Sequence, residues 1–232
     1  MKENNMVINF NKKESLDIYI EYKKQYISLI MLALKNNNFE DYIIPCINLI
    51  YQFIENELKA FILEFYSNDD WNVISMKIST HNIKKLFRDE FLYRKEFKKI
   101  TFFNKIYLKL SKAVDYFYNL LGNDTFFSSR YPVKKVKNKK AFNKISINKL
   151  EFKNNFINFI TAMDYMWLIY NAYLIFQCSM IMSRLKNRDL DVCIEENLKN
   201  FTEKETSNNK YKLIKYIIQE FKENTPIQKI NN

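Results

Sequence analysis

His81 is the single histidine of this 232-residue chain and stands in the stretch KISTHNIKKLF, residues 77–87. An imidazole titrates near neutral pH, so His81 is a candidate general base or acid. The alternative is structural. Ser79 and Thr80 favour a helix N-terminus just before it, and the positive end of a helix dipole disfavours imidazolium. In that interpretation His81 lies in the first turn of a helix, neutral and hydrogen-bonded.

A run of basic residues is the second candidate. Between Arg130 and Lys144 the sequence holds seven basic residues and no acidic one, and we expect a loop at about residues 128–146. Lysines neutralise phosphates and aromatic rings stack on bases, so the run favours contact with nucleic acid. The alternative is a solvated loop without a ligand. The candidate contact residues are Arg130, Tyr131, Lys134, Lys135, Lys137, Lys139 and Lys140.

Arg130 is the most specific candidate for binding a ligand within that run. It precedes Tyr131 and Pro132 in a chain whose basic residues are mostly lysines. A guanidinium can hold a phosphate or a carboxylate through two parallel hydrogen bonds. Arg130 and His81 are therefore the candidate catalytic residues, if the protein is an enzyme.

Gln52, Glu55 and Lys59 form a polar stripe beside the apolar face of a well-patterned helix. Glu55 and Lys59 are spaced i, i+4, and one interpretation is a surface ion pair of a few tenths of a kcal/mol, about 0.3 to 0.5. In the other, they face the interior of the protein and order Arg130 or His81. The stripe is then a supporting polar network for the site.

Several kinds of chemistry are excluded by composition. One glycine, Gly122, excludes a P-loop, a dinucleotide fingerprint and a nucleophile elbow. One histidine and three scattered cysteines argue against a zinc site or a disulfide framework. We therefore expect no metal and no cofactor, although a two-metal nuclease with acids from several helices stays open. The net charge of +11 favours a polyanionic partner.

The chain predicts an all-α fold, because 47% of its residues are hydrophobic and only one glycine and three prolines are available for turns. Pro45 is expected in the first turn of the second helix, where its missing N–H costs little. The N-terminal segment is polar, and a cytoplasmic location is expected. The predicted helices cover about residues 13–35, 45–66, 80–91, 102–121, 149–186, 187–201 and 209–223.

The helix at 149–186 contains the apolar run YMWLIYNAYLIFQCSMIMS, residues 165–183. Its length is just enough to span a bilayer. Because polar residues such as Asn171 and Gln177 interrupt it, we favour a core helix or a dimer interface over a membrane span. A third possibility is that this helix docks another chain, which predicts an exposed apolar strip along it.

Three motifs in order resemble the HEPN superfamily, whose helical domains occur in prokaryotic defence and toxin–antitoxin proteins. The first is a helix with Gln52, Glu55 and the sequence Leu58-Lys59-Ala60. A Thr80-His81 helix start and the Arg130-Tyr131-Pro132 segment follow. The resemblance covers about residues 15–135. It is closest to the Arg-Tyr-Pro subgroup, which is regarded as nucleotide-binding or as a partner module.

This resemblance implies an antiparallel helical bundle, here of about five to seven helices, that dimerises. Residues 1–148 would form the HEPN-like core, and residues 149–232 the C-terminal helices. Many HEPN proteins are metal-independent RNases with an Arg, four to six residues and then His. That motif is absent here, because no arginine precedes His81 and no histidine follows Arg130.

The resemblance therefore implies an RNA- or nucleotide-binding protein of a defence or toxin–antitoxin system, with a possible protein partner encoded nearby. Two alternatives remain. One is a metal-independent endoribonuclease that uses His81 and Arg130 in a rearranged site. The other is a non-catalytic dimerisation or partner module.

Overall fold

The computed structural model describes residues 12–35, 39–66, 70–91, 95–121, 133–136, 139–142, 147–202 and 208–225. These residues are almost all helical, which confirms the all-α class. The chain forms two compact units. Unit 1 consists of Met1–Phe91 and Lys112–Ile157, and unit 2 of Leu92–Ser111 and Asn158–Asn232.

These units differ from the division at residue 148 that the sequence suggested. The reason is that two helices contribute to both units. They are α6 (Thr101–Leu121) and α8 (Lys149–Lys186), and each supplies one end to unit 1 and the other to unit 2.

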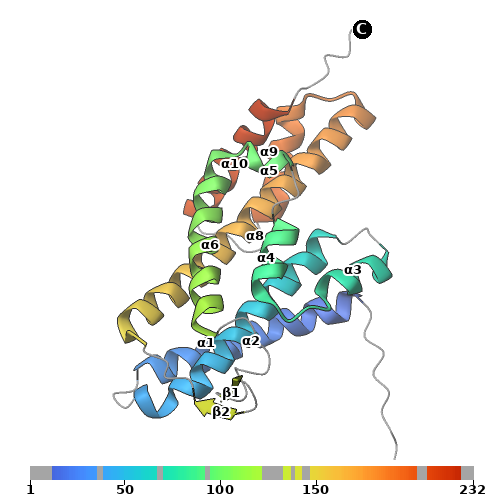
Figure 1. Ribbon diagram of the computed structural model, residues 1–232. Helices are drawn as coiled ribbons and strands as arrows, with labels where there is room; N and C mark the ends of the chain where they lie inside the picture. Colours follow the sequence, from blue (N-terminus) through green and yellow to red (C-terminus); the bar gives the residue numbers. More distant parts are fainter. Residues whose placement is uncertain are drawn as a thin grey trace, which may run out of the picture. The chain divides into compact units, whose positions relative to one another are not determined.

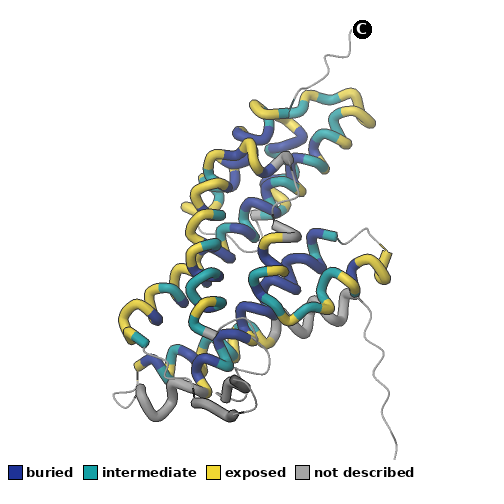
Figure 2. The backbone as a smooth tube through the Cα atoms, viewed as in Figure 1, coloured by how far each residue is buried: buried dark blue, intermediate teal, exposed yellow. Residues whose placement is uncertain are grey.

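In unit 1, α1 (Lys12–Lys35) and α2 (Phe39–Phe65) lie side by side, and α3 (Trp71–Ile78) and α4 (Ile83–Phe91) also pack on α2 (Figure 1). From Cys46 onward α2 is mostly buried, as the dark blue tube in Figure 2 shows. Its Phe53 ring contacts Phe156 of α8, with the ring centroids 5.6 Å apart. Because neighbours cover it on several sides, α2 is apolar around most of its circumference.

Three local predictions were wrong. Pro45 lies inside α2 and not in its first turn, because that helix begins at Phe39. The short helix α3 follows α2 and was not expected, since Ile74 is its one fully buried residue and gives no periodic signal. The helix after it, α4, begins at Ile83 and not near Ser79 or Thr80.

The segment predicted as a basic loop contains a hairpin of two short strands. Strand β1 (Val133–Val136) pairs antiparallel with β2 (Lys139–Phe142), and Val133 lies opposite Phe142 in the register. Valine and phenylalanine favour strands, and a two-residue connection is the commonest hairpin length. The lysine-rich composition concealed this pattern.

Unit 2 contains α5 (Lys95–Lys98), α9 (Leu190–Thr202) and α10 (Asn208–Asn224), together with its parts of α6 and α8. An aromatic cluster forms its core. The Phe97 ring centroid lies 5.3 Å from that of Tyr173 and 5.8 Å from that of Phe221, and the Phe176 and Phe221 rings are stacked. Such pairs stabilise a core beyond the area that they bury.

The ends of α8 and α9 follow from their sequence. Asn187 has a φ of 47°, and the Arg188 N–H donates to the Ser183 carbonyl at 3.0 Å. This is a left-handed helix stop, for which asparagine is a suitable residue. Asp189 then caps α9, because its Oδ1 accepts hydrogen bonds from the backbone N–H groups of Asp191 and Val192.

Helix α8 has the bounds that the sequence predicts, and it is the one helix within the described residues that is long and apolar enough to cross a membrane. The core helix of a soluble protein passes the same test. Ile169, Ala172 and Phe176 of its apolar run are fully buried in unit 2.

Candidate functional site

One face of α2 carries three polar groups toward the connection between α3 and α4. Tyr51, Glu55 and Lys59 are spaced i, i+4 and i+8, so they follow one another along that face. All three residues are buried, with relative exposures of 2%, 7% and 7%. Glu55 and Lys59 therefore face the interior of the protein. They do not form a surface ion pair.

The connection that faces them, residues 79–82, is fixed through its backbone. The Tyr51 hydroxyl donates a hydrogen bond to the His81 carbonyl and also lies 3.4 Å from the Ile83 backbone nitrogen, which donates to it. Asn82 caps α4, because its Oδ1 accepts from the Lys85 N–H at 2.9 Å. His81 thus lies just before the helix and not in its first turn.

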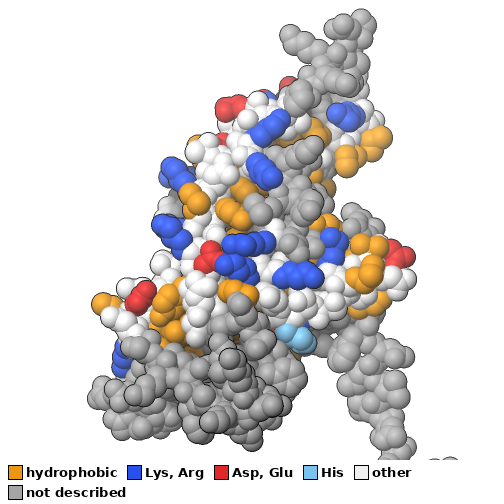
Figure 3. Space-filling view, viewed as in Figure 1, with side chains coloured by type: hydrophobic (Ala, Val, Ile, Leu, Met, Phe, Trp, Pro, Cys, Tyr) orange, Lys and Arg blue, Asp and Glu red, His pale blue; other side chains and the backbone are white. Residues whose placement is uncertain are grey.

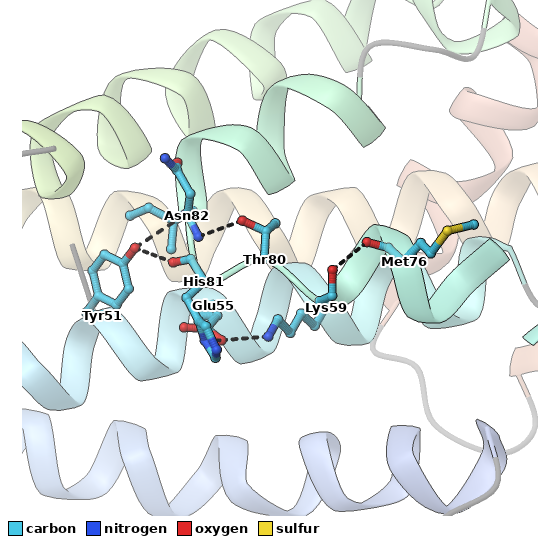
Figure 4. Close-up of polar contacts among 9 residues, drawn as sticks. Tyr51, Glu55, Lys59, Met76, Thr80, His81 and Asn82 are labelled. Atoms are coloured by element: carbon cyan, nitrogen blue, oxygen red, sulfur yellow. Dashed lines mark hydrogen bonds and ion pairs between the residues drawn. The ribbon is translucent and has the colours of Figure 1, made fainter. Parts of the chain in front are cut away.

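The side chain of His81 points at Glu55, as Figure 4 shows. Its Nδ1 lies 2.8 Å from Oε1 of Glu55, and the Lys59 Nζ donates to the same oxygen at 2.7 Å. A charged carboxylate can only accept hydrogen bonds, so Nδ1 of His81 is the donor in this contact. The His81 side chain is half exposed, at 50%, while those of Glu55 and Lys59 are 9% exposed.

Lys59 and His81 together compensate the buried negative charge of Glu55. A carboxylate removed from water is costly unless a cation and hydrogen bonds compensate it. Lys59 supplies the cation, and the imidazole supplies a second donor. The result is a histidine that is oriented by a carboxylate and reaches the surface, which is the arrangement that a general base needs.

Basic side chains of α4 lie next to this histidine in the chain. Lys85 and Arg88 are exposed, while Ile83, Leu86 and Phe87 of the opposite face are buried. Figure 3 shows the histidine in pale blue at the surface, on a face that also carries Lys and Arg side chains in blue.

Lys84 is held differently. Its Nζ lies 2.8 Å from Oδ1 of Asp115 and 5.0 Å from the centre of the Tyr118 ring, which both belong to α6. The α4 cations available to a ligand are therefore Lys85 and Arg88, which we call the α4 cation pair.

The other predicted residues are placed as follows. Gln52 does not join Glu55. It is exposed and accepts a hydrogen bond from Tyr26 of α1 at 3.3 Å, and burial raises the pKa of Tyr26. Arg130, Tyr131 and Lys137 lie outside the described residues. Lys134 and Lys135 are in β1, and Lys139 and Lys140 are in β2, where the structure describes the backbone.

Sequence reasoning missed Tyr51 and Asn82. Tyr51 was counted with the apolar face of α2, but its place four residues before Glu55 was a usable signal. Asn82 is as good a helix cap as the two residues that were considered. Within the described residues, no cluster of three or more His, Cys, Asp or Glu side chains could hold a metal ion.

Comparisons with models of known protein families, with curated proteins and with solved structures found no match for this chain.

Proposed function

We propose that this protein binds RNA or a nucleotide and acts in the cytoplasm as part of a prokaryotic defence or toxin–antitoxin system, as its resemblance to HEPN proteins suggests. The observation that carries the proposal is His81, oriented by Glu55 and half exposed, which precedes the exposed α4 cation pair by four and seven residues in the chain. The net charge of +11 and the lysines of the β1–β2 hairpin support it.

In this proposal the phosphate backbone binds to Lys85 and Arg88, and His81 contacts a phosphate or a base edge. Phosphate contacts by lysine and arginine release counterions and make affinity depend on salt. The hairpin adds a second set of cations, Lys134, Lys135, Lys139 and Lys140. Bound RNA would be recognised by charge and stacking, as in other single-strand binders.

The test is RNA affinity of purified protein as a function of salt, measured by fluorescence anisotropy. Lys85→Glu with Arg88→Glu should weaken binding and reduce the slope of log K against log salt by about 1.4, because each lost contact removes roughly 0.7 for single strands. The matched control is Lys24→Glu with Lys153→Glu, two exposed lysines of α1 and α8. Equal affinity and slope for wild type and the α4 double variant would refute the α4 surface.

The hairpin needs its own variant. Charge reversal of its four strand lysines should weaken binding further in the proposal. Unchanged affinity for RNA and nucleotide in both sets of variants would remove the support for a binding function.

A second candidate function, a metal-independent endoribonuclease, is favoured by the Glu55–His81 contact. A base at Nε2 of His81 could take the proton from a ribose 2′-hydroxyl, whose oxygen then attacks the adjacent phosphorus. The bond from phosphorus to the 5′-oxygen of the next nucleotide breaks, which leaves a 2′,3′-cyclic phosphate, and the departing 5′-oxygen takes a proton from water. Arg130 would stabilise the charge on the phosphate oxygens. The His81 ring is held by the carboxylate, as a general base requires.

Cleavage of labelled RNA in EDTA tests this candidate. The endoribonuclease predicts activity in wild type and its loss in His81→Ala and Arg130→Ala. Glu55→Gln should reduce the rate and alter its pH profile, measured at a temperature at which circular dichroism shows that this destabilised variant is folded. If the wild-type protein binds RNA but does not cleave it, the binding function is supported and the endoribonuclease is refuted.

A further inference from the structure

The connection between α5 and α6 in unit 2 is basic and carries no acid. From residue 97 to residue 111 the sequence has four lysines and no aspartate or glutamate. All four of these residues are exposed. We call them the corner lysines: Lys98, Lys99, Lys105 and Lys109.

The backbone holds the corner lysines together. The side-chain amide of Asn104, in the first turn of α6, donates a hydrogen bond to the Lys98 carbonyl at 3.0 Å. This contact keeps the end of α5 beside the start of α6. Lys105 and Lys109 then follow one turn apart on α6, about 6 Å along its axis. They therefore lie on the same face of that helix.

The corner lysines lack the acidic partners that other cations of unit 2 have. Within the described residues, no carboxylate forms an ion pair with any of the four. The ion pairs of α9 and α10 and the segment before them are Arg188–Glu196, Lys215–Glu195 and Lys222–Asp191. Like charges spaced i, i+4, as in Lys105 and Lys109, destabilise a helix. A bound anion would relieve this repulsion.

One carboxylate of α10 reaches the start of α6, but it does not neutralise the corner lysines. Glu220 is buried, and its Oε2 accepts a hydrogen bond from the Phe102 N–H at 3.4 Å. Its Oε1 accepts another from the Tyr216 hydroxyl at 3.1 Å. Because this carboxylate already occupies the N-terminus of α6, an anion at the surface would depend on the lysine side chains.

The composition of this surface suits nucleic acid better than an acidic protein. Lysines neutralise phosphates and release counterions, whereas the cores of protein–protein interfaces are depleted in lysine. Leu108, 61% exposed, is the one exposed large apolar side chain in residues 97–111. A single exposed leucine is common on protein surfaces and does not make an apolar patch.

We propose that the corner lysines form a second phosphate-binding surface for single-stranded RNA, so that affinity depends on RNA length. This inference rests on the proposed function, because it extends RNA binding to unit 2, whereas His81 and the α4 cation pair belong to unit 1. A strand long enough to reach both surfaces gains affinity, since its second contact forms within one complex.

The test uses full-length protein and labelled single-stranded RNA of about 10 nucleotides, near the size that one binding module covers, and of about 40. Lys105→Glu with Lys109→Glu should weaken binding of the long RNA about 10-fold in fluorescence anisotropy, and that of the short RNA about 2-fold or less, because the α4 surface still binds it. The slope of log K against log salt for the long RNA should fall by about 1.4.

Two controls separate this effect from net charge and from unfolding. Lys210→Glu with Lys212→Glu changes the charge equally at two exposed lysines of α10 and should leave the length dependence intact. Lys105→Glu alone places a carboxylate four residues before Lys109, the order that stabilises a helix. Its thermal midpoint should therefore equal or exceed that of wild type while its affinity for the long RNA falls.

Cross-linking locates the contact directly. Long RNA that contains 4-thiouridine, irradiated with the wild-type protein, should attach to peptides from residues 97–111. The same peptides should be labelled in Lys85→Glu with Arg88→Glu, because the second surface does not include the α4 cation pair.

The outcomes distinguish this inference from the proposed function. Wild-type protein that binds neither RNA would refute both. RNA binding in which the corner variant and the α10 control have equal affinity for the long RNA would overturn only the second surface, and so would the absence of cross-links in residues 97–111. Displacement of the long RNA by poly-L-glutamate at a lower concentration of charge than by polyuridylate would assign the corner lysines to an acidic protein.

Discussion

Glu55 and His81 are 26 positions apart in the chain, yet their side chains meet at 2.8 Å between Oε1 and Nδ1. The carboxylate comes from the most buried helix of unit 1, and the imidazole comes from an irregular connection. Packing of α3 and α4 on α2 produces this contact. A rigid helix therefore determines where the one histidine of the chain points.

The buried Glu55–Lys59 pair makes a testable contribution to stability. Removing one member leaves the other charged and buried, which typically costs about 3–5 kcal/mol. We expect Glu55→Gln alone to show a loss of that order in urea unfolding, and Glu55→Gln with Lys59→Met to recover most of it. Asp191→Asn, at a 65% exposed carboxylate paired with Lys222, should change stability by about 1 kcal/mol or less. Equal losses in the single and double variants would contradict this account.

Tyr51 should stabilise the connection through its hydroxyl alone. Tyr51→Phe keeps the ring but removes the donor to the His81 carbonyl. We expect a loss of about 1–3 kcal/mol, because the carbonyl loses its partner inside the protein. Thermal unfolding measures it. An unchanged midpoint would mean that water replaces the hydroxyl.

Asn82 should matter more than Ser79 for α4. Asn82→Ala removes the side-chain acceptor for the Lys85 N–H and should cost about 1 kcal/mol. Ser79 ends α3, and its hydroxyl donates to the Met76 carbonyl, so Ser79→Ala serves as the comparison. The two unfolding curves decide which residue caps the helix. A larger loss in Ser79→Ala would assign the cap to the residue that the sequence favoured.

The three cysteines should differ in reactivity. Burial raises the pKa of the Cys46 thiol to about 11, so almost no thiolate is present at pH 8. Cys178 is exposed, and we expect an alkylating reagent to label it first in the folded protein. Peptide mass spectrometry after timed labelling checks the order. Early labelling of Cys46 would show that the α2 core opens readily.

Acid should lower the folding stability of unit 2. The Lys215 ammonium, through its hydrogen bond, lowers the pKa of Glu195 from the ordinary 4.5, and Arg188 does the same for Glu196. A carboxyl whose pKa is lower in the folded state stabilises the protein above the unfolded value, and this stabilisation is lost as the pH falls through the folded value. Thermal midpoints should therefore fall below about pH 4.5. Lys215→Met should make that fall shallower, and an identical pH profile would contradict the assignment.

The long helix α8 could be predicted from the sequence, but the short helix α3 and the β1–β2 hairpin could not. Helix α8 has the predicted bounds because a long apolar run ends in Arg184 and Lys186 and is followed by Asn187. Helix α3 was missed since it buries little, and the β1–β2 hairpin was hidden by lysines. The choice of Asn82 over Ser79 depends on how α3 and α4 pack on α2, which a local pattern does not contain.

Part of the candidate site could be predicted from the sequence. Glu55, Lys59 and His81 were recognised as polar residues worth attention, but two interpretations of the stripe stayed open. Burial decides between them, and burial depends on contacts between helices that are distant in the chain. Tyr51 was overlooked because a tyrosine in an apolar row has the same pattern as a core residue.

Helix α8 carries Phe152 and Phe156 in unit 1 and Phe176 in unit 2, and each unit is assembled from two separate stretches of chain. Neither unit can therefore be produced by truncating the gene at one point. A cut at residue 148 would deprive unit 1 of two fully buried phenylalanines. Removal of residues 149–232 would take residues 149–157 from unit 1 and residues 158–232 from unit 2, so a single cut there damages both units.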